Sequence, residues 1–297
     1  MSKLLRFAVA ALMIGTALPA IAAEADWSKV AQALGKEGSV QPGGVYRVGL
    51  PRSDLHVMLD GVTVKPGLAL GGWLAFEPMG RNAMVMGDLV LTQDEIAPVM
   101  RKFEEGGIEI TALHNHLLRS EPMTLYMHVL GQGDPVKLAQ ALHAGLTLSK
   151  TPLQAAAQTP AAAPAIDFDT GAVDKAMGYK GRNSGGIYQF TIPRAKPVSE
   201  DGMAIPAAMG SAIGINFQPT GGGKAAITGD FVLAASEVNP VIKALAASGI
   251  EVTALHSHML TEQPRLFFIH FWANDDAQKL ARGLRTALDR IDVKKSG

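Results

Sequence analysis

The chain repeats itself at one fixed offset, and this duplication limits its architecture more than any other feature of its 297 residues. Matching segments lie 142 positions apart, with one slip to 141 that is later recovered. The pairs are GGVY at 43–46 with GGIY at 185–188, GDLVL at 87–91 with GDFVL at 229–233, and TALHNH at 111–116 with TALHSH at 253–258. Solenoid repeats are only about 20–50 residues long, so a period of this length indicates duplicated domains.

An Ala/Pro-rich stretch, TPLQAAAQTPAAAPA, separates the two copies. It has no regular spacing of large apolar residues, and this composition is typical of a semi-extended linker. We therefore place a first domain at 23–150, a linker at 151–166 and a second domain at 167–297.

Within each copy, the pattern of apolar residues predicts an α+β fold, a mostly antiparallel sheet with two or three helices. Thr92 and Glu95 fit a capping box at the start of a helix that ends at Gly106. A strand is expected from Ile108 to about Leu117, with a return strand over 123–130 after a turn. Further helices are expected over 27–34 and 135–146, and extended segments near 45–50, 55–59, 73–76 and 83–91.

The first 22 residues have the pattern of a signal peptide. Lys3 and Arg6 form a short positive segment, residues 7–18 are apolar, and Ala-Ile-Ala at 20–22 fits a cleavage site. The apolar run is too short to span a bilayer, and no later run is long and apolar enough to do so. We expect cleavage before Ala23 and a protein that acts in the periplasm or outside the cell.

Charge and cysteine content exclude several classes of partner and site. Lys+Arg and Asp+Glu number 27 each, which does not favour nucleic acid or an anionic membrane surface and leaves a small ligand or an envelope component. The absence of cysteine excludes disulfides, thiolate metal sites and a cysteine nucleophile.

Several segments together resemble the LppY/LpqO family, exported bacterial proteins of unknown function whose domain often occurs in tandem. They are GDLVL leading into a helix, IEITALHNHLL, the Glu121-Pro122 pair at the turn, and LYMHV at 125–129. The resemblance covers about 26–148 and 169–291. It implies a location in the cell envelope and no particular activity. Family members look like lipoproteins, whereas this chain lacks the cysteine for lipid attachment and is expected to be released.

The repeated histidines are the most informative polar residues. His114 and His116 are two apart on a predicted strand, so both side chains are expected on one face, at the end of the apolar face formed by Ile108 and Ile110. His128 lies on the return strand, and an even register would place it beside His114, whereas a slip of one residue would turn it away. The second copy repeats the set as His256, His258 and His270.

Three converging neutral imidazoles are typical of a divalent-metal site, with carboxylate or water as the fourth ligand. Asp88, Asp230 and Glu121 are the candidate carboxylate ligands; because Glu121 aligns with Gln263, Glu262 is the corresponding candidate in the second copy. Nitrogen and oxygen ligands without cysteine favour zinc, with copper(II), nickel and ferrous iron as alternatives.

Two other functions fit the same histidines. In a metal-dependent hydrolase, Glu121 or Asp88 would act as base, and the replacement of Glu121 by Gln263 would leave only the first copy competent. In an envelope binding module, the histidines would be core residues hydrogen-bonded to Asp, Thr or backbone. The sequence leaves open whether the protein is an enzyme.

Other polar and aromatic positions suggest supporting roles. Arg52 and Arg194 are expected in structural ion pairs, with the repeated aspartates or an anionic ligand as partners. Tyr126 and Phe268 share the parity of the third histidine and are expected to form a wall of the same site. His56 and His143 are not repeated and are expected at the surface.

Overall fold

A computed structural model describes residues 26–154 and 164–295, and it gives the two copies the same fold. The strands of the first sheet are β1 (Ser39–Val40), β2 (Tyr46–Pro51), β5 (Gly71–Met79), β6 (Asn82–Thr92), β7 (Glu109–His114) and β8 (Thr124–Gly133). Its helices are α1 (Trp27–Leu34), α3 (Gln93–Glu105) and α4 (Pro135–Leu146). Between β2 and β5, a connecting segment contains β3 (Val57–Leu59), β4 (Val62–Val64) and the short helix α2 (Pro66–Ala69).

The second copy repeats these elements in the same order. Its sheet contains β9 (Arg182–Ser184), β10 (Ile187–Pro193), β13 (Ala212–Gly221), β14 (Lys224–Ala234), β15 (Glu251–His256) and β16 (Leu266–Asp276). Its helices are α5 (Thr170–Met177), α6 (Ala235–Ala247) and α7 (Ala277–Leu288). Its connecting segment contains β11 (Ser199–Glu200), β12 (Met203–Ala204) and a 3₁₀ turn, η1 (Ala207–Met209).

Each copy has one six-stranded sheet in which every pairing is antiparallel. The strand orders are β1-β2-β5-β6-β8-β7 and β15-β16-β14-β13-β10-β9. In both, the return strand of the predicted hairpin (β8 or β16) lies between its hairpin partner and the long strand before the helix. The predicted α+β fold with two tandem copies is therefore confirmed.

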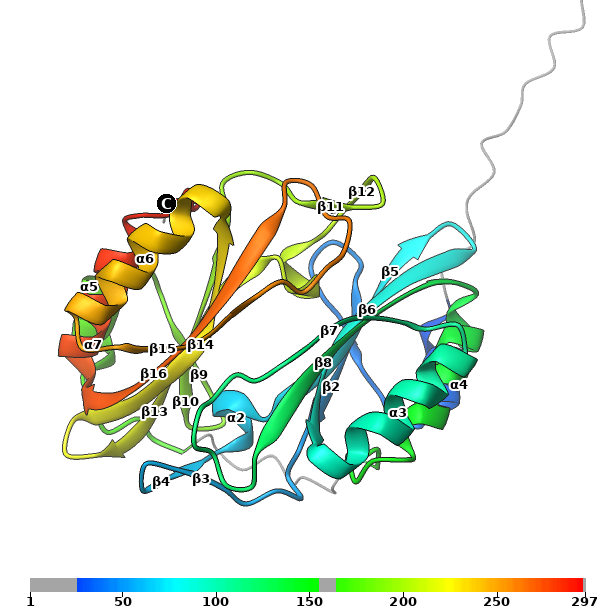
Figure 1. The fold of residues 1–297 in the computed structure, drawn as a ribbon, viewed down its shortest axis with the longest axis horizontal. Coiled ribbons are helices and arrows are strands. Elements are labelled where there is room, and N and C mark those ends of the chain that lie inside the picture. The colour runs from blue at the N-terminus through cyan, green and yellow to red at the C-terminus, as the bar shows by residue number, and fades with distance from the viewer. Residues whose placement is uncertain (1–25, 155–163, 296–297) are drawn as a thin grey trace, which may run out of the picture.

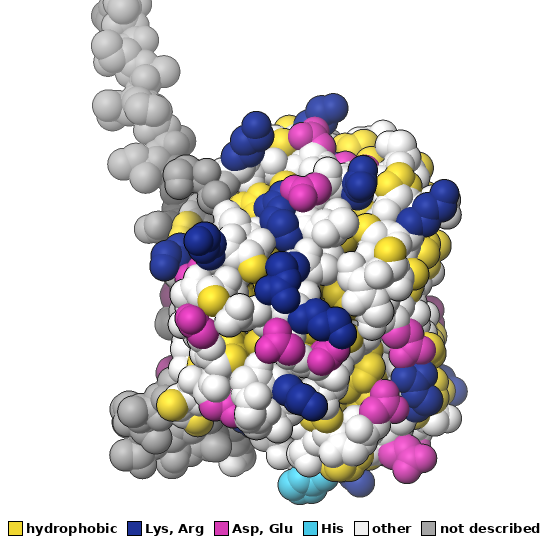
Figure 2. Space-filling model, turned by 90° about the vertical axis from the view of Figure 1, so that its left-hand side faces the viewer, with side chains coloured by type: hydrophobic (Ala, Val, Ile, Leu, Met, Phe, Trp, Pro, Cys, Tyr) yellow, Lys and Arg dark blue, Asp and Glu magenta, His cyan; other side chains and the backbone are white. Residues whose placement is uncertain are grey.

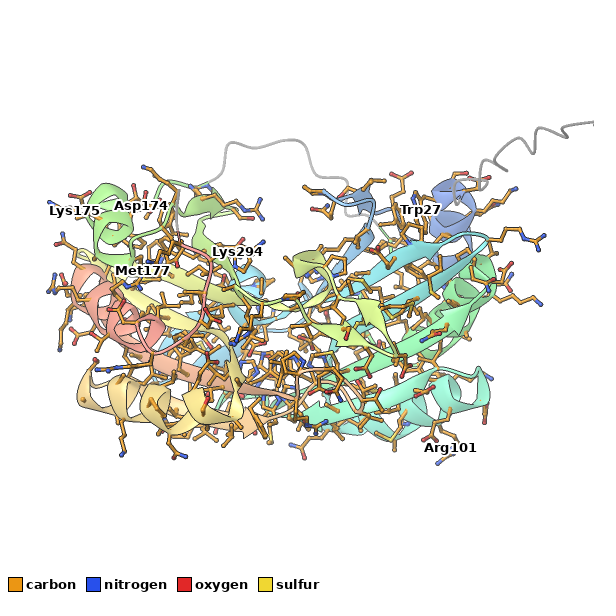
Figure 3. All side chains as sticks on the ribbon, turned by 90° about the horizontal axis from the view of Figure 1, so that it is seen from above. Trp27, Arg101, Asp174, Lys175, Met177 and Lys294 are labelled. Atoms are coloured by element: carbon orange, nitrogen blue, oxygen red, sulfur yellow. The ribbon has the colours of Figure 1, made fainter. Side chains whose placement is uncertain are left out.

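The longer helices lie on the outer sides of the molecule, whereas the short α2 lies between the copies, where the two sheets face each other (Figure 1). The view from above shows the same layers, with Trp27 of α1 and Met177 of α5 at corresponding ends (Figure 3). On the outer side of the second copy, charged side chains of both signs are scattered among apolar ones (Figure 2). Each sheet therefore has a helix-covered face and an inner face turned toward the other copy.

Strand alternation explains how both faces are buried. In β6, Val85 and Leu89 pack in the core beneath the helices, whereas Met86 packs with the apolar core of the second copy. Val90 packs in a third cluster with residues from both copies, including Trp272 of β16. The near-continuous apolar sequence of β6 thus reflects a strand buried on both faces.

The connecting segment of each copy holds the opposite copy by hydrogen bonds. Gln218 accepts from the backbone of Lys65 at 2.9 Å and donates to Thr63, both in the first copy's connecting segment. In the other direction, the guanidinium of Arg47 donates to the carbonyl oxygen of Ala208 in η1. The two copies form a continuous packed unit through these contacts and the shared apolar clusters.

Some sequence predictions fall on residues that the structure leaves out. The predicted signal peptide at 1–22 and residues 155–163 of the predicted linker lie outside the described ranges. At the start of that linker, Thr151 is buried and Leu153 packs on the core of the first copy. No helix in residues 26–154 or 164–295 has the length and apolar character needed to cross a membrane.

A buried ion pair joins β2, β6 and α3. The capping box is confirmed: Glu95 accepts from the backbone of Thr92 at 2.9 Å at the start of α3. Arg52, which is completely buried, donates to Glu95 at 2.7 Å and to the carbonyl of Val90 at 2.7 Å. The expected structural ion pair therefore forms, but with Glu95 and not with Asp88. Arg194 and Glu237 make the same pair in the second copy.

We predict that Arg52→Met lowers the free energy of unfolding by about 3–5 kcal/mol, because it leaves the buried Glu95 carboxylate without its cation. Urea denaturation followed by circular dichroism measures this. The control is Arg101→Met on the exposed side of α3 (Figure 3), where surface substitutions change stability by less than about 0.5 kcal/mol. Equal midpoints for the two variants would contradict the prediction.

Candidate metal centre

The hairpin register brings the predicted first-copy histidines to one face. His128 of β8 lies opposite Asp88 of β6 on one side and Ala112 of β7 on the other. His114 lies opposite Tyr126, two residues before His128, so both histidines point to the inner face. Their ring centroids are 5.1 Å apart. The even register that the sequence left open is the one the structure has.

A β-bulge at Thr111 corrects the predicted apolar face. The register shifts between Ile110 and Ala112, so one extra residue is inserted in β7. Ile108 and Ile110 pack with the core under the helices, whereas His114, beyond the bulge, faces the opposite sheet. The histidines therefore do not continue the face of the isoleucines. The prediction follows from an unbroken alternation of side chains along β7, and the bulge reverses the face on which the residues after it lie.

His116 lies beyond the strand and is held by other contacts. The strand predicted to reach about Leu117 ends at His114. The carbonyl of His116 accepts from the hydroxyl of Thr253 in the second copy at 2.5 Å. Its ring stacks on Tyr126, with centroids 3.2 Å apart, and His258 stacks in the same way on Phe268 at 3.6 Å. Tyr126 and Phe268 are therefore beside the histidines, as expected.

The histidines of the two copies form one group, which we call the histidine cluster. The most closely stacked pairs of histidine rings each contain one ring from each copy. Their centroids are 3.5 Å apart for His114–His256, 3.6 Å for His116–His270 and 3.8 Å for His128–His258. The six histidines thus lie together between the two inner sheet faces; the sequence indicated one set per copy and left open whether the two sets meet.

Two groups of ring nitrogens lie within 4.8 Å of one another, close enough to share a metal ion. The first contains the three histidines of the first copy, and the second contains the three histidines of the second copy together with His114. His114 belongs to both groups and is at the centre of the cluster.

The Nε2 atoms of the cluster are not used in hydrogen bonds to the described residues. In all six histidines Nε2 is buried and has no hydrogen-bond partner among the described residues. Nδ1 of His270 donates to the carbonyl of Gly229 at 2.8 Å, and Nδ1 of His114 donates to the carbonyl of Asn115 at 3.1 Å. A carbonyl only accepts, so these bonds place the proton on Nδ1 and leave Nε2 as the metal-binding atom.

Burial keeps the cluster neutral. Burial lowers the pKa of His114 to about 4. Burial, together with repulsion from His114 when that ring is protonated, lowers the pKa of His256 to about 3. The pKa values of the other four members are held well below the ordinary value, first by burial and then by the neighbouring imidazoles. Neutral imidazole is the form that binds metal.

Asp88 and Asp230 lie beside the cluster as predicted. Nε2 of His128 is 3.8 Å from Asp88, and Nε2 of His258 and of His270 are 3.8 and 4.0 Å from Asp230. Burial raises the pKa of Asp88 to about 7, against the opposing charge of Arg47. Burial and the charge of Asp88 raise that of Asp230 well above its ordinary value.

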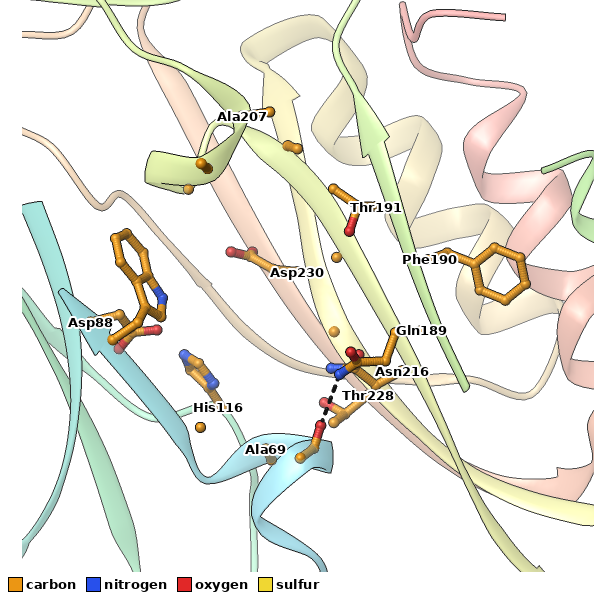
Figure 4. A pocket seen from close by; sticks show the side chains of 18 of the residues that line it. Ala69, Asp88, His116, Gln189, Phe190, Thr191, Ala207, Asn216, Thr228 and Asp230 are labelled. Carbon is orange, nitrogen blue, oxygen red and sulfur yellow. Dashed lines mark hydrogen bonds between the residues drawn. The ribbon is translucent and has the colours of Figure 1, made fainter. Parts of the chain in front are cut away.

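A cavity of about 590 Å³ between the copies borders the cluster on one side. Figure 4 shows Asp88, Asp230 and His116 around it, with Thr191 and Asn216 of the second copy on its wall. Arg47 and Trp73 of the first copy also line it. Sequence reasoning did not identify these wall residues, because they are not repeated between the copies.

The remaining candidates lie elsewhere. Glu121 is exposed, and its backbone pairs with Met58 of β3. Glu262 is buried, but its carboxylate accepts from the backbone of Leu266 at 2.9 Å and pairs with Arg265. His56 is exposed, whereas His143 is half-buried and its Nδ1 donates to the carbonyl of Leu34 at 2.8 Å.

Both copies match the same family model, described as Domain of Unknown Function (DUF1259), over residues 28–148 and 171–290. The chain belongs to this family. A comparison with curated proteins finds no match.

Two solved structures are similar over most of their length. They are the trimeric bacterial microcompartment shell protein PduB (12% identity, 88% of this chain and 97% of that one, TM-score 0.22) and EtuB from Clostridium kluyveri (10% identity, 86% and 91%, TM-score 0.20). At these TM-scores the likeness does not bear on function.

We predict that Gly229→Ala destabilises the protein by about 1–3 kcal/mol. A Cβ at this position would lie 2.1 Å from the carbonyl oxygen of Gly214, so β13 and β14 would have to separate. The control is Gly214→Ala on the facing strand, where a Cβ meets no atom within 4 Å. Thermal unfolding compares the two, and equal melting temperatures would contradict this reading of the strand contact.

Proposed function

We propose that the protein binds a divalent metal ion in the joint histidine cluster and handles that metal in the cell envelope. The observation that carries the proposal is the set of six buried Nε2 atoms that have no hydrogen-bond partner in residues 26–154 and 164–295. Buried polar atoms are nearly always partnered, and an unpartnered one costs about 1–3 kcal/mol. Six in one place are best explained by a ligand that accepts their lone pairs.

Zinc fits this donor set best, with copper(II), nickel and ferrous iron as alternatives. Ligand atoms bonded at about 2.0–2.1 Å to a tetrahedral zinc lie about 3.4 Å from one another. The groups within 4.8 Å therefore need only small side-chain movements to close on an ion. The adjacent carboxylates of Asp88 and Asp230 would hold or orient the coordinated groups.

The alternatives from the sequence have less support. Hydrolysis with Glu121 as base is not favoured, because its side chain is exposed and it belongs to neither histidine group. Purely structural histidines would be expected to use their ring nitrogens in protein hydrogen bonds, and the Nε2 atoms of the cluster make none within the part of the chain that the structure describes.

We predict that protein purified without an affinity tag contains near-stoichiometric metal, and that His114→Ala with His256→Ala removes it. These residues belong to the two groups that share His114. Elemental analysis gives the content, and zinc added at about 100 times its Kd should stabilise the parent by about 2.7 kcal/mol after its metal has been removed with a chelator. His56→Ala is the control because that residue is exposed and outside both groups. A folded, metal-free parent that zinc does not stabilise would refute the proposal.

The envelope location rests on the N-terminal sequence and on the resemblance to the LppY/LpqO family. We predict that the chain, expressed in a Gram-negative host, is recovered from the periplasm or medium with Ala23 as its first residue. Mass spectrometry of the intact mature protein checks the cleavage position. Recovery of the uncleaved chain, with Met1 still present, from the cytoplasmic fraction would contradict export. That result would not bear on the proposal of a metal site.

A further inference from the structure

The two copies differ in the cavity walls although they agree in the histidine cluster. The sheet registers fix which positions correspond, because Trp73 lies opposite Asp88 as Gly214 lies opposite Asp230. The histidines and aspartates are the same in both copies. Around them, four first-copy residues, Arg47, Gly49, Ala75 and Met86, correspond to Gln189, Thr191, Asn216 and Thr228.

These differences make the cavity asymmetric. The second copy supplies a polar wall, with the hydroxyl and amide groups of Thr191, Asn216 and Thr228 lining the space. In the first copy, Ala75 and Met86 are buried in apolar packing. The amide nitrogen of Asn216 donates to the carbonyl of Leu68 at 3.0 Å and so also holds the interface. We regard the hydroxyls of Thr191 and Thr228 and the amide oxygen of Asn216 as ligand contacts.

Arg47 is the second distinctive feature. Its guanidinium lies over the ring of Trp73, 4.1 Å from the centroid, and donates to Ala208. No carboxylate lies within ion-pair distance of it in residues 26–154 or 164–295. An arginine clamped on an aromatic ring, with donors left over beside a cavity, suits recognition of a carboxylate.

The charge around the cavity also favours an anion. Arg47 and the exposed Arg182 line it, together with Asp88 and Asp230. Fully ionised, these four side chains would sum to zero. A divalent metal in the cluster adds two positive charges. A small anionic ligand would balance them, whereas a cation would be repelled.

We infer that the cavity binds a small carboxylate, with its carboxylate groups shared between the metal and Arg47. This inference rests on the proposed function, because the metal supplies the charge that selects an anion. The polar wall of the second copy would accept the ligand's hydroxyl or amide groups, and Trp73 would cover one side. The site would be asymmetric although its metal-binding side is nearly two-fold symmetric.

The test is calorimetric titration of the zinc-loaded full chain with malonate, and with uncharged malonamide as the matched probe. We expect malonate to bind and malonamide not to bind. Arg47→Gln, which installs the residue of the second copy, should weaken malonate binding at least about tenfold without changing zinc content. Arg101→Gln on the outer side of α3 should leave malonate binding unchanged.

A second variant covers the case in which Arg47→Gln disturbs the interface. Thr228→Met places the corresponding first-copy residue into the cavity and should block malonate while zinc remains bound. Zinc content is measured before and after each titration. A chain that holds no zinc refutes the proposed function and this inference together. A zinc-loaded chain that binds malonamide as well as malonate, or that binds malonate equally in both variants and the parent, overturns this inference alone.

Discussion

The structure depends on six imidazoles and two carboxylates that are buried or half-buried where the inner faces of the two sheets meet. Burying polar groups without partners is costly, and charging them there would cost far more. The low pKa of His114 and of the other histidines keeps the cluster neutral, and the rings stack on one another across the interface. A single copy would expose this face to water, so each copy needs the other to complete both its core and its histidine site.

The interface also explains why the connecting segments are as long as they are. The segment between β2 and β5 reaches the second copy through Lys65, and η1 reaches back to Arg47. Arg47 and Ala208 line the cavity, and both contacts hold the two sheets together. Because the cluster is built from β7, β8, their counterparts and the residues that follow β7 and β15, a small change in the distance between the sheets would alter the stacking contacts between histidines of different copies. The apolar clusters shared by both copies oppose such a change.

The sequence predicted what depends on local pattern and missed what depends on docking. The capping box of Glu95 and the placement of Tyr126 beside the histidines followed from spacing and parity, and both are confirmed. The bulge at Thr111 reversed the parity of β7, and no glycine or proline in that strand indicates it. The joint cluster could not be predicted, because periodicity within one copy carries no information about which face of it meets the other. Arg47 was missed for a related reason: the duplication draws attention to repeated residues, and Arg47 matters because it is not repeated.

The positions of Glu121 and Asp88 bear on whether the site could be catalytic. The replacement of Glu121 by Gln263 suggested that only one copy could hold a complete active site. Since Glu121 is exposed and both copies contribute to a single cluster, that difference has no bearing on the site. Of the two candidate bases, Asp88 is the one that borders both the histidines and the cavity, and burial raises its pKa to about 7. General acid–base catalysis is most efficient when the pKa of the catalytic group lies near the operating pH. A binding protein and an enzyme would therefore use the same residues at this site. The difference would be whether the bound carboxylate is released unchanged or as a product.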